Sequence, residues 1–162
     1  MRATILAALA TAALLTGTAR AGEPVTPEMW HEAQAEAARL SGGTLSLSNA
    51  RPTQIVSLPI EELCELFGRC PHAAAYGSDV AWFRDDRPWA SDRGHHFGIV
   101  IHEAAHSLQS RVMSRACREV QAHAIQVAWL LERGEVDRLD AVAGNAGHYD
   151  CSPENAPIRR AS

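Results

Sequence analysis

Length, composition and charge limit what this chain can be. It has 162 residues, the length of one domain, and 46% of them are apolar, which is enough for a packed core. Its 19 acidic residues outnumber its 15 basic ones, and no stripe of basic and aromatic residues occurs. The composition therefore argues against nucleic acid as a partner.

The first 21 residues have the pattern of a secretory signal peptide. Met1-Arg2 is a positive start, and the apolar block from Ala3 to Leu15 is too short to span a bilayer. Ala19-Arg20-Ala21 fits an A-x-A cleavage site. We therefore expect one secreted or periplasmic domain over residues 22–162, with no stable membrane anchor; a retained anchor is the alternative.

All four cysteines follow the predicted cleavage site. An even number of cysteines in an oxidising compartment predicts two disulfides, and four cysteines allow three pairings among which the sequence does not choose. Local spacing favours Cys64 with Cys70 across the Gly68-Arg69 turn, which leaves Cys117 with Cys151. Thiolate ligation of zinc requires C-x-x-C spacing, which the chain lacks.

The first predicted element of the mature chain is an amphipathic helix. Thr26 is its N-cap, Pro27 takes the first helical position, and the alanine-rich run reaches Leu40 before it stops at Gly42-Gly43. The periodicity of apolar residues then predicts strands over Thr44–Ser48 and Gln54–Leu58, a helix over Pro59–Phe67 and a strand over Asp79–Arg84.

The strand over Asp79–Arg84 has two interpretations. It forms either a sheet edge, whose unpaired N–H and C=O groups could pair with an extended peptide, or an ordinary core strand. A polar loop over residues 87–94 follows it, and then come His95 and His96, which we expect to face solvent or line a cleft.

A long apolar run from Phe97 to Met113, with Ser91 or Asp92 as its N-cap, predicts a helix that contains an H-E-x-x-H motif. On a helix, His102 and His106 project from one face about one turn apart, so both imidazoles can reach one tetrahedral zinc ion. Glu103 lies roughly 100° round the helix, where it can accept a proton from water. The alternative is a chance match among eight histidines.

A catalytic zinc needs a third protein ligand, and the next helix is expected to supply it. Ser114 is a plausible N-cap for a helix over residues 115–133, with Gly134 as its stop. If the two helices form an antiparallel hairpin, residues whose numbers sum to about 225 face each other. His106 then opposes Glu119 and His102 opposes His123, and either Glu119 or His123 could complete the site.

The two motifs also resemble a known family. HEAAHSLQ at residues 102–109, followed by REVQAHAIQ at residues 118–126, resembles small exported bacterial proteins of the gluzincin type. These carry H-E-x-x-H-x-L-Q and then R-E-x-x-A-x-x-x-Q, and the resemblance spans about residues 73–131. It implies an α+β, zincin-like minimal domain, with a small sheet and an active-site helix hairpin.

The resemblance also implies roles for individual residues. The zinc ligands would be His102, His106 and Glu119, and Glu103 would be the catalytic base. In the family that the motifs resemble, an aromatic residue is common where this chain has His123. That departure leaves His123 open as a fourth metal contact or as a catalytic hydrogen-bond donor.

The expected function is zinc-dependent hydrolysis of peptide bonds in a peptide or protein substrate, by a metal-activated water. The hydrogen-bond donor to the oxyanion would be His123. His148 or Tyr149 could take this role if a Cys117–Cys151 disulfide tethers their loop; otherwise the segment is a plain surface loop.

Two alternative functions remain: a catalytically silent zincin-like module that binds another exported protein, and a metal-free domain stapled by disulfides. Oligomeric state is not indicated. Three aspartates could orient a ligand histidine: Asp137, Asp140 and Asp150.

Overall fold

The computed structural model describes residues 22–71 and 73–152, so the predicted signal peptide lies outside the described residues. Within that part the fold is α+β, with five α-helices and one mixed sheet of three strands. The helices are α1 (Pro27–Leu40), α2 (Ile60–Phe67), α3 (His95–Leu108), α4 (Arg115–Glu132) and α5 (Leu139–Ala146). The strands are β1 (Gln54–Leu58), β2 (Ala74–Gly77) and β3 (Val80–Arg84), and two short 3-10 turns are η1 (Leu47–Asn49) and η2 (Val136–Arg138).

The sheet has helices on both faces. Its order is β1-β3-β2, with β1 parallel and β2 antiparallel to the central strand β3. Ala81 and Phe83 of β3 are fully buried, and Phe83 packs edge-on against Trp30 of α1. Trp82 points to the opposite face, where its ring centroid lies 5.2 Å from that of Phe67 in α2. This alternation allows one strand to contact both helical layers.

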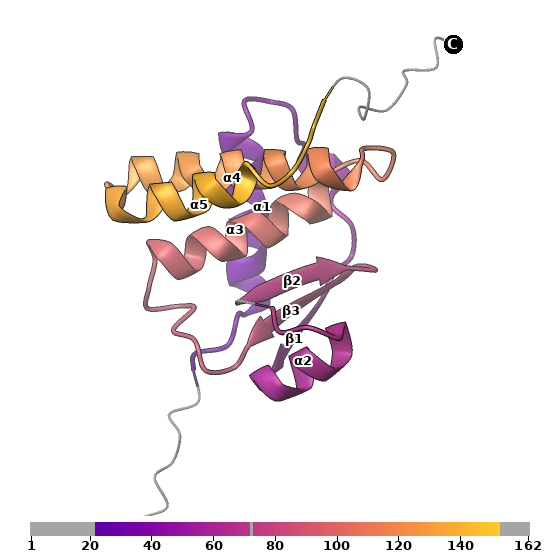
Figure 1. Cartoon of the computed structure of the whole chain (residues 1–162), viewed down its shortest axis with the longest axis vertical. Helices are drawn as coiled ribbons and strands as arrows, with labels where there is room; N and C mark the ends of the chain where they lie inside the picture. The colour runs from indigo at the N-terminus through magenta and orange to yellow at the C-terminus, as the bar shows by residue number, and fades with distance from the viewer. Residues whose placement is uncertain (1–21, 72, 153–162) are drawn as a thin grey trace, which may run out of the picture.

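Helix α3 lies between the sheet and helices α4 and α5, whereas α2 lies on the opposite face of the sheet (Figure 1). Helix α3 packs on β2, crosses α1 and runs beside α4, and α5 packs on α4. Gly98 allows α3 to approach α4 closely, because a Cβ at this position would lie 3.2 Å from Cδ1 of Trp129. On the α1 side, buried Gln34 donates a hydrogen bond of 2.9 Å to Ser107. Neighbours on three sides explain why α3 is apolar apart from its few functional side chains.

The strands correct one interpretation of the sequence. The strands predicted over Gln54–Leu58 and Asp79–Arg84 form, but β3 is the central strand, so the sheet-edge interpretation of Asp79–Arg84 is wrong and the core-strand interpretation is confirmed. The edge strand that packs on α3 is β2, which the sequence pattern missed. Four residues are too few to show a period, and β2 forms because the Ser78-Asp79 turn folds it back on β3.

The strand predicted over Thr44–Ser48 is wrong. The segment forms turns followed by η1. Ser41 accepts the Leu45 amide at 3.0 Å, and Ser46 accepts the Ser48 amide at 3.2 Å. Serine side chains that bond nearby amides replace a strand ladder, which the alternating pattern could not reveal.

Helix α3 is displaced relative to its predicted range of Phe97 to Met113. It begins at His95, whose amide donates to the Asp92 carboxylate at 3.0 Å, so Asp92 provides the expected side-chain cap although Gly94 takes the N-cap position. It ends at Leu108, because Gln109 has an extended backbone. Residues 110–113 form the turn into α4, which begins after its predicted cap, Ser114.

Two disulfides are present, and they follow the pairing that local spacing favoured. Cys64 is joined to Cys70, and Cys117 to Cys151. Disulfides of this kind agree with an oxidising, extracytoplasmic compartment. Among the described helices, none has the length and apolar content needed to cross a membrane.

Candidate metal centre

The hairpin of α3 and α4 brings the two sequence motifs together. The helices are antiparallel, and Ser114 caps α4 by accepting the Cys117 amide at 3.2 Å. His106 faces Glu119, and the ring centroids of His102 and His123 lie 4.4 Å apart. The two pairs predicted to face each other across the hairpin, His106 with Glu119 and His102 with His123, are therefore both present.

Glu119 lies between the two histidines of the H-E-x-x-H motif. Its Oε2 atom is 3.5 Å from Nε2 of His102 and 3.5 Å from Nε2 of His106. Both separations exceed the usual range of an N–H···O hydrogen bond. Two donors that each lie ~2.1 Å from a tetrahedral ion are separated by ~3.4 Å. The separation of Glu119 from each of the two histidines therefore matches that of two ligands on one metal ion.

His123 adds a further donor on the His102 side. The potential ligand atoms of His102, Glu119 and His123 all lie within 4.8 Å of one another. The same limit holds for His102, Glu103 and His106. Because Glu119 approaches both motif histidines, it is the better placed of the two candidates for a third ligand, and His123 borders the centre from one side.

Glu103 is a buried carboxylic acid beside these donors, with 7% of its surface exposed. Burial raises the pKa of Glu103 to about 7; the positive charge of His106 opposes this rise and the carboxylate of Glu119 adds to it. A carboxyl group with a pKa near neutrality can accept and release a proton at physiological pH. Its environment thus suits an acid–base role.

Mutual contacts and burial set the protonation of His102, His106 and Glu119. Burial lowers the pKa of His102 to about 4, so its imidazole is neutral at pH 7. Burial also opposes the charged form of His106, but Glu119 and Glu103 outweigh it and raise the pKa of His106. For Glu119, the two histidines outweigh burial and hold the pKa of the carboxyl well below its usual range. Glu119 is therefore an ionised ligand candidate.

Gln109, which the sequence analysis did not assign, orients His106. Its Oε1 lies 2.7 Å from Nδ1 of His106, while its Nε2 donates to the Arg118 carbonyl at 2.7 Å. The amide oxygen can only accept, so Nδ1 carries a proton, and Nε2 can bind a metal once the ring has lost its second proton. Its place three residues after His106 could have indicated this contact. The aspartates proposed for this role are exposed and do not contact a histidine of the centre: Asp137, Asp140 and Asp150.

Arg51 fixes the end of α3, and the sequence gives no sign of it. Its guanidinium donates to the Gln109 carbonyl at 2.8 Å and also to the carbonyl of His106. Its Nε lies 2.9 Å from the Asp79 carboxylate. Arg51 therefore satisfies carbonyls left unpaired at the helix end and ties them to the β2–β3 hairpin. Because 55 residues separate Arg51 from His106, no local pattern reveals the contact.

The remaining predicted residues take different positions. Tyr149 lies beside His123, with ring centroids 6.1 Å apart, whereas His148 is exposed. The Cys117–Cys151 disulfide holds this segment against α4. His95 and His96 are half-buried at the start of α3, where Nδ1 of His96 lies 2.6 Å from the Asp92 carboxylate. Neither of them joins the cluster around His102.

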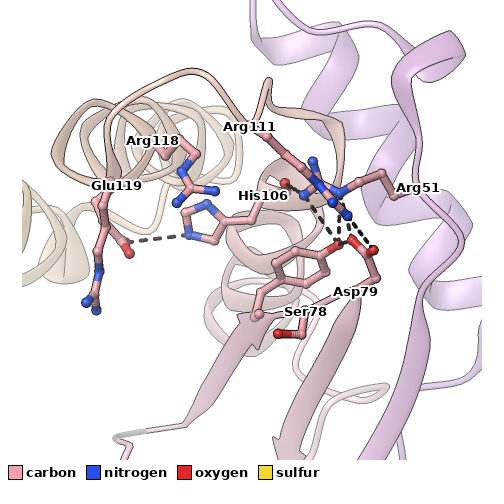
Figure 2. Close-up of a pocket in the computed structure, with 10 residues that line it drawn as sticks. Arg51, Ser78, Asp79, His106, Arg111, Arg118 and Glu119 are labelled. Carbon is pink, nitrogen blue, oxygen red and sulfur yellow. Dashed lines mark hydrogen bonds and ion pairs between the residues drawn. The ribbon is translucent and has the colours of Figure 1, made fainter. Parts of the chain in front are cut away.

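A cleft opens next to these donors (Figure 2). Its volume is about 550 Å³, and His106 and Glu119 line it. Tyr76 of β2 forms part of its wall, and its ring lies roughly parallel to that of His106, with centroids 6.3 Å apart. The centre is therefore accessible from the side of the β2–β3 hairpin. Comparison of the chain with protein-family models, curated proteins and solved structures finds no match.

Proposed function

We propose that this protein is a zinc-dependent peptidase with a zincin-like fold, of the gluzincin type that its motifs resemble. The observation that carries the proposal is the position of Glu119, 3.5 Å from Nε2 of both His102 and His106. A chance H-E-x-x-H match gives no reason for a third donor at that point. The buried acid Glu103 beside the three donors is the second requirement of the chemistry.

The proposed ligands are His102, His106 and Glu119. Two imidazoles and one carboxylate form a donor set typical of catalytic zinc, which keeps one coordination position open. When bound, zinc supplies the positive charge that polarises a peptide carbonyl and makes water acidic enough to lose a proton near neutral pH. Gln109 supports the assignment because it holds His106 in the tautomer that presents Nε2.

Glu103 is the proposed base. Its carboxylate accepts a proton from water as the water oxygen adds to the carbonyl carbon. It then passes that proton to the amine nitrogen as the carbon–nitrogen bond breaks. In the metal-free protein burial raises the pKa of Glu103 to about 7, so its carboxylate is a stronger base than that of an exposed glutamate.

The oxyanion that forms on the carbonyl needs a hydrogen-bond donor. His123 and Tyr149 are the two candidates that lie near the centre, because His123 contacts His102 and Tyr149 contacts His123. His148, the other residue considered from the sequence, is exposed. We therefore assign this role to the His123–Tyr149 pair.

The test compares the wild-type protein with Glu103→Gln. The variant keeps all three proposed ligands, so we expect unchanged zinc content and a loss of peptide hydrolysis of at least about 100-fold, since general acid–base catalysis contributes ~10²–10⁴. Glu62→Gln is the matched control, because Glu62 is exposed on α2, away from the cleft.

Elemental analysis gives the zinc content, and sequencing of products from a proteome-derived peptide library gives the cleavage. Full turnover by zinc-loaded Glu103→Gln would eliminate the proposed role of Glu103. A zinc-loaded wild-type protein that cleaves no peptide would instead favour the binding-module alternative.

A further inference from the structure

The cleft beside the candidate metal centre is strongly basic, although the mature chain is acidic. After the predicted cleavage site the chain has 13 arginines, no lysine and 19 acidic residues. Arg51, Arg111, Arg115 and Arg118 all line this one cleft, with Asp79 and Glu119 as its acidic lining residues. Like charges gathered in one place repel each other, so the cluster needs an explanation.

Two of the four arginines have a structural explanation. Arg51 lies 2.9 Å from Asp79, and Arg111 lies 2.6 Å from the other oxygen of the same carboxylate. Tyr76 donates to Asp79 as well, at 3.2 Å. This network, visible in Figure 2, joins the end of α3 to the β2–β3 hairpin. In it the negative charge of Asp79 is paired with Arg51 and Arg111.

The other two arginines have no such explanation. Arg115 and Arg118 are three residues apart on α4, so they project from the same face, and neither forms an ion pair with any residue in the described part of the chain. Nε of Arg118 is buried and has no hydrogen-bond partner among the described residues. Figure 2 shows the Arg118 guanidinium beside the His106 ring.

We infer that Arg115 and Arg118 bind a carboxylate of the peptide substrate in this cleft, next to the bond that is cleaved. This inference rests on the proposed peptidase function and specifies its substrate class as acidic peptides. A guanidinium binds a carboxylate through two parallel N–H···O bonds, a geometry that lysine cannot provide. A divalent ion held by two neutral imidazoles and one carboxylate has one excess positive charge, which also favours an anionic substrate.

The carboxylate has two sources, an Asp or Glu side chain near the cleaved bond or the C-terminus of the peptide. Three peptides of identical length separate these sources. One has an internal Glu and an amidated C-terminus, one has Gln and a free C-terminus, and one has Gln and an amidated C-terminus. The last peptide carries no carboxylate and serves as the neutral reference.

The test measures the affinity of each peptide for zinc-treated, mature Glu103→Gln by calorimetry, so that the peptides are not consumed. We expect at least one carboxylate peptide to bind about tenfold or more tightly than the neutral peptide, as for other charge-assisted contacts. Adding Arg115→Gln and Arg118→Gln should remove that preference. Arg118→Lys should restore only part of it, because lysine lacks the bidentate geometry.

The matched control carries Arg69→Gln and Arg138→Gln instead, which change the net charge equally at two exposed arginines outside the cleft lining. This control should keep the preference. Circular dichroism and the two single variants, Arg115→Gln and Arg118→Gln, separate a loss of recognition from a loss of folding.

Equal binding of the neutral peptide, no binding of any peptide, or a preference that survives in the double arginine variant would each overturn the inference. Cleavage of a peptide library by the wild-type protein tests the proposed function separately. Cleavage without preference for acidic sequences would leave the peptidase and remove the carboxylate site. Selective binding without any cleavage would leave the carboxylate site and remove the peptidase.

Discussion

The two helices of the hairpin contribute to the candidate metal centre in different ways. α3 carries His102, Glu103 and His106, each no more than 8% exposed, and its apolar residues pack on α1, α4 and the sheet. α4 carries Glu119 and His123, which are less buried, and it has solvent along much of its length.

The difference extends to the contacts that hold each side chain. His106 is fixed by Gln109 and, through its carbonyl, by Arg51. The only ion pairs of Glu119 in the described part of the chain are those with the two imidazoles. The α3 side is therefore preorganised by the fold, whereas the position of Glu119 depends on how α4 is held against α3.

The largest effect is expected from the α4 side. Glu119→Gln should weaken zinc binding about 1000-fold or more, because it removes a charged donor that approaches both motif histidines, and loss of an outer contact alone costs ~10–100-fold. His123→Gln should cost less than about tenfold. Competition with a chromophoric zinc chelator measures both. A greater loss in His123→Gln would make His123 the third ligand.

The two disulfides should contribute differently to the free energy of unfolding. Cys117→Ala with Cys151→Ala removes a link across 34 residues and should lower the free energy of unfolding by about 3–4 kcal/mol. Cys64→Ala with Cys70→Ala is the matched control; it opens a link across 6 residues and should cost about 2 kcal/mol. Urea denaturation measures both. Only the first pair should also weaken zinc binding, since Cys117 is two residues from Glu119, and an equal zinc loss in both would contradict the comparison.

Glu103 should destabilise the metal-free protein at neutral pH. Burial raises the pKa of Glu103 from 4.5 to about 7 in the folded state, so the folded protein binds this proton more tightly than the unfolded chain does. The free energy of unfolding of the metal-free protein should therefore fall as the pH rises from 4.5 to 7. Metal-free Glu103→Gln should therefore be more stable than the wild type at pH 7, by up to about 3 kcal/mol, and equally stable near pH 4. Urea denaturation with a chelator across this pH range tests the effect. A constant difference at all pH values would contradict it.

A smaller effect than that of Glu119→Gln is expected where the α3 side is only loosened. Gln109→Ala removes the acceptor at Nδ1 of His106 but no ligand, so zinc affinity should fall ~10–100-fold. Gln54→Ala, at an exposed position of β1, is the control and should leave the affinity unchanged. If Gln109→Ala matched Glu119→Gln in its effect, preorganisation of the α3 side would matter as much as a ligand.

Much of the helical part of the fold could be read from local signals. Thr26 with Pro27 marked the start of α1, Gly68 the end of α2 and Ser114 the start of α4, because caps and stops act within one turn of the chain. The wrong and missed elements are those that depend on partners or on side-chain contacts with nearby backbone. η1 forms because serines bond nearby amides, and β2 forms only by pairing with β3.

For the candidate site, the helical repeat predicted which residues share a helix face and, on the assumption of a hairpin, which pairs face each other. His102 and His106 follow from the helical repeat, and Glu119 and His123 from the length of the turn between α3 and α4. The contacts of Arg51, the position of β2 and the basic cleft beside the centre could be found only from the folded chain. These features join residues that are far apart in the chain, and their positions depend on the packing of whole elements rather than on any local period.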